Sequence, residues 1–174
     1  PICVPAHPLA RRLLRLAKIP LAAPSANLFG YISPTTAAHV HEGLGARIPH
    51  ILDGGACAVG VESTVLDMTN PRQPRVLRPG AVAVAELENF LGVKVHCAKA
   101  RGARSRQLAP GMLERHYSPR TPLVLRRPTS QTPPAGTAIV WLRKPPGQKS
   151  MNDIFWLSRR GALAEIARNL YAVL

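Results

Sequence analysis

The chain has 174 residues, which is enough for one ordinary domain or for parts of two. Hydrophobic residues make up 46% and charged residues 18%, so a wholly disordered chain is excluded, and the aromatic share of 5% argues against a base-stacking surface for single-stranded nucleic acid. The formal net charge of +14 predicts polyanionic ligands. No apolar run reaches about 18 residues, so we expect neither a membrane span nor a membrane partner.

The cysteines indicate a reducing compartment. Cys3, Cys57 and Cys97 are odd in number and far apart, and they form no C-x-x-C pair. A disulfide framework or a zinc knuckle is therefore not expected, and we expect a cytoplasmic protein or one of an organelle matrix. His39 and His41 point to different faces of a predicted helix, so no metal site is expected there.

Two helices are predicted near the amino end. From His7 to Lys18, leucines recur at helical spacing and arginines lie off that stripe. Ser33 and Pro34 are typical of an N-cap and a first helical position, and the helix that they begin is expected to end near Gly43 or Gly45. A short extended piece at 20–24 and a loop at 25–32 join the two helices.

The middle of the chain is predicted to alternate strands and helices. Strands are expected at 48–53, 59–68 and 75–77, and a helix is expected from Val82 to Leu91, with Gly92 at its carboxyl end. Asp53-Gly54-Gly55 marks the break between the first two strands.

A second α/β unit is predicted after a basic linker. Strands are expected at 122–126, 136–142 and 154–157, and a helix at 162–174 with apolar residues on one side, including Leu163 and Ile166. The whole pattern predicts a layered α/β (α+β) fold, with one domain at 1–98, the linker at 99–122 and the start of another domain at 123–174.

The linker carries many of the surplus positive charges. Contact with phosphates and a solvated connector kept soluble by charge are both open interpretations. The arginines in and just after this stretch are Arg101, Arg104, Arg106, Arg115, Arg120, Arg126 and Arg127.

Two groups of polar residues could do chemistry. Pro24-Ser25-Ala26-Asn27 and Ser33-Pro34-Thr35-Thr36 form a loop before a helix amino terminus, which suits phosphate or carboxylate. Ordinary turn and capping chemistry is the alternative, and for this segment alone we prefer it. Gly60-Val61-Glu62-Ser63-Thr64-Val65-Leu66-Asp67 places polar groups in a predicted strand, where a ligand could be their partner. Alternatively, Glu62 and Asp67 cap neighbouring turns.

Two further segments are candidates for ligand contact. Arg78, in Leu77-Arg78-Pro79-Gly80, ends a predicted strand and could pair with phosphate, although a surface arginine is the alternative. The linker stretch from Gly111 to Pro119 carries His116 and Tyr117, which offer a ring and two hydrogen-bonding groups.

Taken together and in order, PSAN, SPTTA, GVESTVLD, LRPG and GMxxxHYSP resemble the second half of the YrdC-like threonylcarbamoyl-AMP synthases, in their long form with a linker and an extra carboxyl-terminal domain. The resemblance implies a partial YrdC-like twisted-sheet domain followed by the start of a small Rossmann-like α/β domain. It also implies the conversion of ATP, L-threonine and bicarbonate to threonylcarbamoyl-AMP and pyrophosphate, assisted by Mg²⁺. The product would pass to a tRNA threonylcarbamoyl transferase complex.

The resemblance also implies residue roles. The nucleotide is expected at Ser25, Asn27, Ser33, Arg78 and Tyr117, the last as a lid over it. Threonine is expected at Ser63 and at the backbone near Ala23. Positioning and charge neutralisation serve such chemistry more than a nucleophile does, so no catalytic residue is named.

Two departures from the family pattern bear on activity. The family's K-x-R signature would lie upstream of residue 1, and Cys3 stands where the family usually has an arginine facing threonine. We therefore expect a fragment, cut at both ends, with little or no activity alone. A double-stranded RNA or tRNA-binding module and a non-catalytic nucleotide-binding paralogue are the alternatives.

Overall fold

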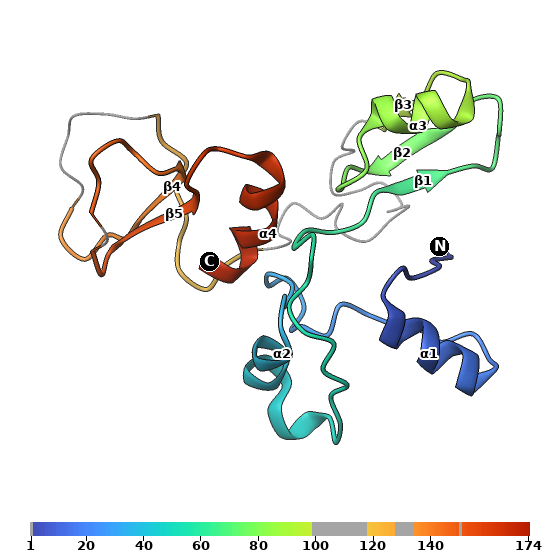
Figure 1. The fold of residues 1–174 in the computed structure, drawn as a ribbon, viewed down its shortest axis with the longest axis horizontal. Coiled ribbons are helices and arrows are strands. Elements are labelled where there is room, and N and C mark those ends of the chain that lie inside the picture. The colour runs from blue at the N-terminus through green and yellow to red at the C-terminus, as the bar shows by residue number, and fades with distance from the viewer. Residues whose placement is uncertain (1, 99–117, 128–133, 150) are drawn as a thin grey trace.

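Four α-helices and two small sheets form the described part of this computed structural model, which covers residues 2–98, 118–127, 134–149 and 151–174 (Figure 1). In chain order the elements are α1 (Pro8–Ala17), α2 (Ala37–Leu44), the 3-10 turn η1 (Gly45–Arg47), β1 (Val65–Asp67), β2 (Arg75–Arg78), α3 (Val84–Leu91), β3 (His96–Cys97), β4 (Ile139–Arg143), β5 (Ile154–Ser158) and α4 (Leu163–Val173). The predicted mixture of α and β layers is confirmed.

Helix α1 confirms the first predicted helix. Pro8 stands at its first position, where a missing N–H costs nothing, and Lys18 ends it in the left-handed conformation with φ 56°. His7 precedes the helix, and its Nε2 lies 3.2 Å from the carbonyl oxygen of Gly54. The apolar stripe is largely exposed in the described structure, because Leu16 is 72% exposed.

Helix α2 begins later than predicted. Its N-cap is Thr36, whose hydroxyl accepts a 3.2 Å hydrogen bond from the backbone N–H of His39, so the prediction of Ser33 as the N-cap is wrong. Ser33 instead donates its hydroxyl proton to Glu62, which removes it from capping. Gly45 ends the helix, as one of the two predicted glycines.

The first sheet has the order β1-β2-β3. Strands β1 and β2 are antiparallel, while β3 is parallel to β2, and α3 lies between these two strands in the chain. The helix α3 confirms the prediction, and Gly92 ends it at φ 68°, where a left-handed residue is needed. Val76 of β2 and the nearby Val95 are the buried hydrophobic residues of this part, and Val76 is 2% exposed.

Two strand predictions in the middle of the chain need correction. Residues 48–53 form no strand, although Asp53 does make the predicted break by accepting a 2.8 Å hydrogen bond from the N–H of Gly55. The predicted strand at 59–68 is reduced to β1, because the residues before Val65 bond to distant parts of the chain instead of to a neighbouring strand.

The second sheet contains β4 and β5, which run parallel with Ile139 beside Ile154. Leu157 of β5 is 1% exposed and forms the centre of this part. The hydroxyl of the buried Ser158 donates to Glu165 at 2.5 Å and accepts N–H groups of the loop that leads into α4. These bonds hold the amino end of α4 against β5.

The carboxyl-terminal predictions are partly confirmed. Strands β4 and β5 and helix α4 occur where they were predicted, but residues 122–126 form no strand. Leu125 in that segment is 94% exposed, so its apolar side chains are not packed on either sheet. Leu163, predicted on the inner side of α4, is 82% exposed because it stands at the first position of the helix. Among the described residues, no helix has the length and apolar character needed to cross a bilayer.

The carboxylate of Asp67 generates a test of pH-dependent stability. The N–H and hydroxyl of Thr69, and then the guanidinium of Arg75 at 2.7 Å, lower the pKa of Asp67 from 3.8 to about 2. A lowered folded-state pKa stabilises the protein above the unfolded value, and this contribution is lost as the pH falls toward 2. We expect Asp67→Asn to reduce the loss of stability between about pH 4 and pH 2.

Urea unfolding midpoints at several pH values measure this effect. Asp53→Asn is the matched control, since its carboxylate also accepts a local backbone N–H. An unchanged acid limb in Asp67→Asn would contradict the assigned cause.

Candidate active site

The loop that carries the S-x-N sequence is closed by its own side chains. Ser25 donates its hydroxyl proton to Oδ1 of Asn27 at 2.5 Å, and Nδ2 of Asn27 donates to the carbonyl oxygen of Tyr31 at 2.8 Å. Ala26 adopts φ 54°, which lets the chain turn sharply between them. The loop is therefore held in one shape, and the exposed Ala23 lies just before it.

Ser33 connects this loop to the polar segment of the chain at 60–64. Its hydroxyl donates to Oε1 of Glu62, and both residues are half-buried. A hydroxyl bonded to a carboxylate is a charge-assisted contact, which is stronger than a neutral one. The polar segment at 60–64 is thus hydrogen-bonded to Ser33, which follows the S-x-N loop. Of the two predicted turn caps, Asp67 does cap the turn at Thr69, whereas Glu62 takes a distant partner.

Arg78 also contacts the polar segment, at Ser63. Its Nε and Nη2 donate to the carbonyl oxygen of Ser63 at 3.1 and 2.9 Å, and Nη2 lies 3.3 Å from the Ser63 hydroxyl. Arg78 is the last residue of β2, so the strand end fixes where the guanidinium lies. Because Glu62 and Ser63 are consecutive, Ser33 and Arg78 contact the same short segment although they lie far apart in the chain.

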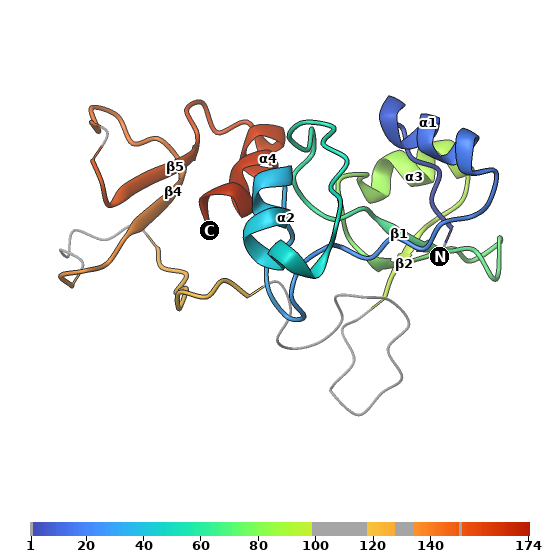
Figure 2. The same cartoon turned by 90° about the horizontal axis from the view of Figure 1, so that it is seen from below.

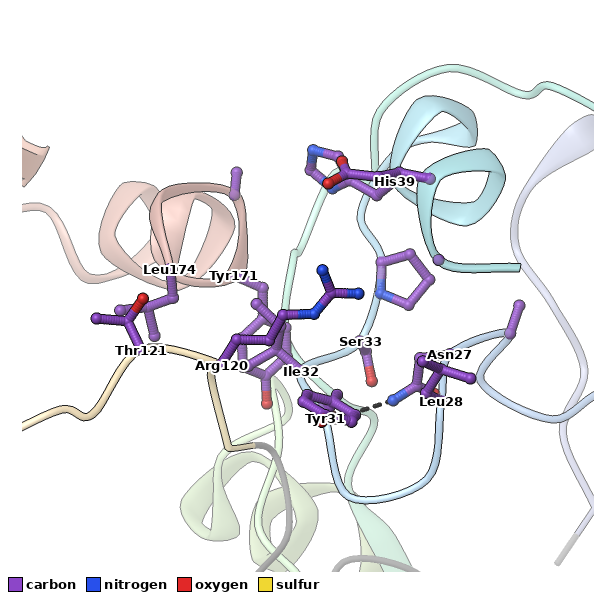
Figure 3. A pocket seen from close by; sticks show the side chains of 15 residues that line it. Asn27, Leu28, Tyr31, Ile32, Ser33, His39, Arg120, Thr121, Tyr171 and Leu174 are labelled. Carbon is purple, nitrogen blue, oxygen red and sulfur yellow. Dashed lines mark hydrogen bonds between the residues drawn. The ribbon is translucent and has the colours of Figure 1, made fainter. Parts of the chain in front are cut away.

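A cavity of about 380 Å³ opens beside the S-x-N loop (Figure 3). Of the predicted site residues, Asn27 and Ser33 line it, whereas Ser25, Ala23, Ser63 and Arg78 do not. Tyr117 lies outside the described residues. The remaining lining comes from Ala26, Leu28, Tyr31, Ile32, Pro34, His39, Glu42, Gly43, Arg120, Thr121, Tyr171, Ala172 and Leu174.

Described residues near the end of the predicted linker contact the S-x-N loop. The N–H of Ser118 donates to the carbonyl oxygen of Gly30 at 2.9 Å, and Tyr31 and Ser118 form a parallel bridge. The guanidinium of Arg120 lies 5.8 Å from the centre of the Tyr31 ring, within the range of a cation–π contact. The end of the predicted linker therefore contributes Arg120 and Thr121 to the lining of the cavity.

Sequence reasoning missed several cavity residues. Arg120 was named only among the arginines for which phosphate contact was left open, and it was not placed in the site although it follows the HYSP motif. Tyr171 lies in α4, where helical periodicity identifies the inner side of the helix but not what lies opposite. Within the described residues, no group of three or more His, Cys, Asp or Glu side chains could hold a metal ion.

Two family models match the chain. Residues 1–80 match the family described as telomere recombination, whose model carries the YrdC name, and residues 82–174 match the threonylcarbamoyl-AMP synthase carboxyl-terminal domain. The second match spans more than half of the chain. The chain belongs to the threonylcarbamoyl-AMP synthase family.

Curated members of the threonylcarbamoyl-AMP synthase family support the assignment. The Pyrococcus abyssi enzyme is 36% identical over 182 residues, covering 98% of this chain and 53% of the relative. The Bacillus subtilis enzyme is 43% identical over 125 residues, covering 71% of this chain and 36% of the relative. The chain thus spans about half the length of the first relative and about a third of the second.

Solved structures of the family share the fold. The crystal structure of P. abyssi Sua5 complexed with L-threonine matches with a TM-score of 0.70 at 32% identity, over 97% of this chain and 52% of that one. A variant of P. abyssi Sua5 matches with a TM-score of 0.72 at 30% identity, over 98% of this chain and 52% of that one.

The contact between Ser33 and Glu62 should contribute to stability. We expect Ser33→Ala to lower the free energy of unfolding by about 1–3 kcal/mol, because a half-buried carboxylate loses a donor. Ser25→Ala is the matched control and should cost less than about 1 kcal/mol, since Ser25 is exposed and its bond stays within one loop. Chemical denaturation at neutral pH measures both values, and equal losses would contradict the role given to Ser33.

Proposed function

We propose that this protein acts in the synthesis of threonylcarbamoyl-AMP. ATP, L-threonine and bicarbonate would give threonylcarbamoyl-AMP, pyrophosphate and water, with the phosphoanhydride bond between the α and β phosphates broken. The observation that carries the proposal is the meeting of Ser33 and Arg78 at the consecutive residues Glu62 and Ser63, in a chain of this family. A hydroxyl and a guanidinium that contact one short segment are groups suited to bind the phosphates of a triphosphate.

The residue roles in this proposal follow the family resemblance. Ser25, Asn27, Ser33, Arg78 and Tyr117 would hold the nucleotide. Asn27 and Ser33 already line the cavity, and Arg78 lies at the adjoining segment. The guanidinium would neutralise charge that develops as pyrophosphate leaves, which is electrostatic rather than nucleophilic catalysis.

L-Threonine would be held at Ser63 and at the backbone near Ala23. The hydroxyl of Ser63 lies within 3.3 Å of Arg78, so the amino acid and the phosphates would share this guanidinium's neighbourhood. The structure of P. abyssi Sua5 complexed with L-threonine supports threonine as the amino acid. Bicarbonate would be the third substrate, as the family resemblance implies.

Mg²⁺ would enter with the triphosphate. This ion keeps several waters and takes one or two carboxylates together with phosphate oxygens, so a cluster of protein ligands is not required. Glu62, bonded to Ser33 at the segment shared with Arg78, offers a carboxylate in a suitable place. The ion's contribution when bound would be to neutralise phosphate charge.

The biological setting is also part of the proposal. The product would pass to a tRNA threonylcarbamoyl transferase complex, and the protein would act in the cytoplasm. The three cysteines are free and exposed, which agrees with a reducing compartment. We retain the domain division at 1–98, 99–122 and 123–174 as part of this proposal, with the linker joining the two units.

Pyrophosphate release tests the proposed function. With ATP, L-threonine, bicarbonate and Mg²⁺ present, we expect threonine-dependent release from a version of the protein that also carries the family's K-x-R signature, because little or no activity is expected without it. Arg78→Gln should lower kcat/KM by about 10- to 100-fold, because a bidentate cation at the site is lost. Arg72→Gln is the matched control, since Arg72 is an exposed arginine in a nearby turn.

The outcomes separate clearly. Threonine-dependent release that is reduced in Arg78→Gln and normal in Arg72→Gln supports the proposal. Failure of the K-x-R-containing version to release pyrophosphate from ATP and threonine would overturn it, and equal activity of its two variants would remove Arg78 from the site.

A further inference from the structure

Helix α4 forms one side of the cavity beside the S-x-N loop. Tyr171, Ala172 and Leu174, at the carboxyl end of this helix, face the cavity across from Asn27 and Ser33. Residues of α2, among them His39 and Glu42, line the same cavity, so α4 and α2 flank it although they are more than a hundred residues apart in the chain; Figure 2 shows both helices. The carboxyl-terminal part of the protein therefore contributes side chains to the same hollow as the S-x-N loop.

The position of α4 is fixed by a close backbone contact. Nε of Arg168 donates to the carbonyl oxygen of Ala58 at 2.9 Å. Gly60 is buried with φ 79°, and a Cβ atom there would lie 2.4 Å from the carbonyl oxygen of Arg168. Only glycine allows this approach. Gly60, which contacts α4, lies just before Glu62 and Ser63 in the chain. The contact with α4 is therefore next to the residues that contact Ser33 and Arg78.

The cavity has two sides of different chemistry. Asn27 and Ser33 provide an amide and a hydroxyl on the side of the S-x-N loop, whereas Tyr171 and Leu174 provide an aromatic ring and aliphatic surface on the side of α4 (Figure 3). Arg120 extends between the two sides. A nucleotide has the same division, because its base is flat and apolar on both faces while its phosphates are anionic.

We propose that Tyr171 of α4 is the base-side contact of the nucleotide site, so that the carboxyl-terminal helix completes the pocket that the S-x-N loop begins. This inference rests on the proposed function, because it takes the ligand to be ATP. A base that lies on the Tyr171 ring would place its phosphates toward Arg120 and Ser33. Stacking on an aromatic side chain is tolerant of the base but needs the ring.

The test compares ATP with inorganic pyrophosphate, which has phosphates but no base. In the intact chain, with Mg²⁺ held constant, we expect Tyr171→Ala to weaken ATP binding on the order of tenfold and to leave pyrophosphate binding unchanged. Tyr171→Phe keeps the ring and should bind ATP within about twofold of the unsubstituted protein. Tyr171→Leu keeps an apolar side chain without the ring, so it tests the ring if the alanine variant does not fold.

Two further variants are included: a control on α4 itself, and a change at Gly60, which contacts α4. Leu163→Ala lies at the exposed amino end of α4 and should not alter ATP binding. Gly60→Ala lies outside the cavity lining but should weaken ATP binding, because the added Cβ displaces α4.

Calorimetric titration gives distinguishable outcomes. Weaker ATP binding with unchanged pyrophosphate binding in Tyr171→Ala supports the inference. Equal ATP binding by Tyr171→Ala and the unsubstituted protein, or equal loss of ATP and pyrophosphate binding, overturns the inference alone. Failure of the unsubstituted protein to bind ATP overturns both the inference and the proposed function.

Discussion

The hydrogen bonds made by the backbone and side chains of residues 58–64 hold the candidate site together. This segment has too many polar groups for an ordinary buried strand, and each described contact satisfies one of them. The partners come from three separate parts of the chain. Arg168 bonds Ala58, Ser33 bonds Glu62, and the stretch after β2 contributes both Arg78, which bonds Ser63, and Val82, which exchanges hydrogen bonds with Thr64. Through these contacts, residues 58–64 are the shared neighbour of Ser33, β2 and α4.

Two glycines make this convergence sterically possible. Gly60 admits the backbone of α4, and Gly80 lies so close to the segment that a Cβ would be 2.3 Å from the nitrogen of Thr64. Neither approach tolerates a side chain without a backbone shift. A displacement of α4 would therefore also move the residues that contact Ser33 and Arg78. The same arrangement explains why a pocket for one nucleotide could need both the amino-terminal and the carboxyl-terminal parts of the chain.

Local rules predicted the elements whose signals are local. Helices α1, α3 and α4 follow from periodicity, a proline at a first position and a glycine at a carboxyl end, and β2 follows from a short β-branched run before a turn. The strands expected at 48–53 and 122–126 do not form, because a strand needs a neighbour and periodicity does not supply one. Ser33 failed as a helix cap for a related reason, since Glu62 is a stronger partner than a helix terminus.

The site was predictable to the extent that motifs mark it. The polar residues at 60–64 and Arg78 were singled out as needing partners, and the structure brings Ser33, Glu62, Ser63 and Arg78 together. Tyr171 could not be found and Arg120 could not be placed, because their positions in the cavity depend on how α4 and the end of the linker pack. Hydrogen exchange with and without ATP tests the central claim most directly. We predict that ATP slows exchange in residues 25–33, 58–64 and 163–173 together; slowing confined to residues 25–33 would contradict the account.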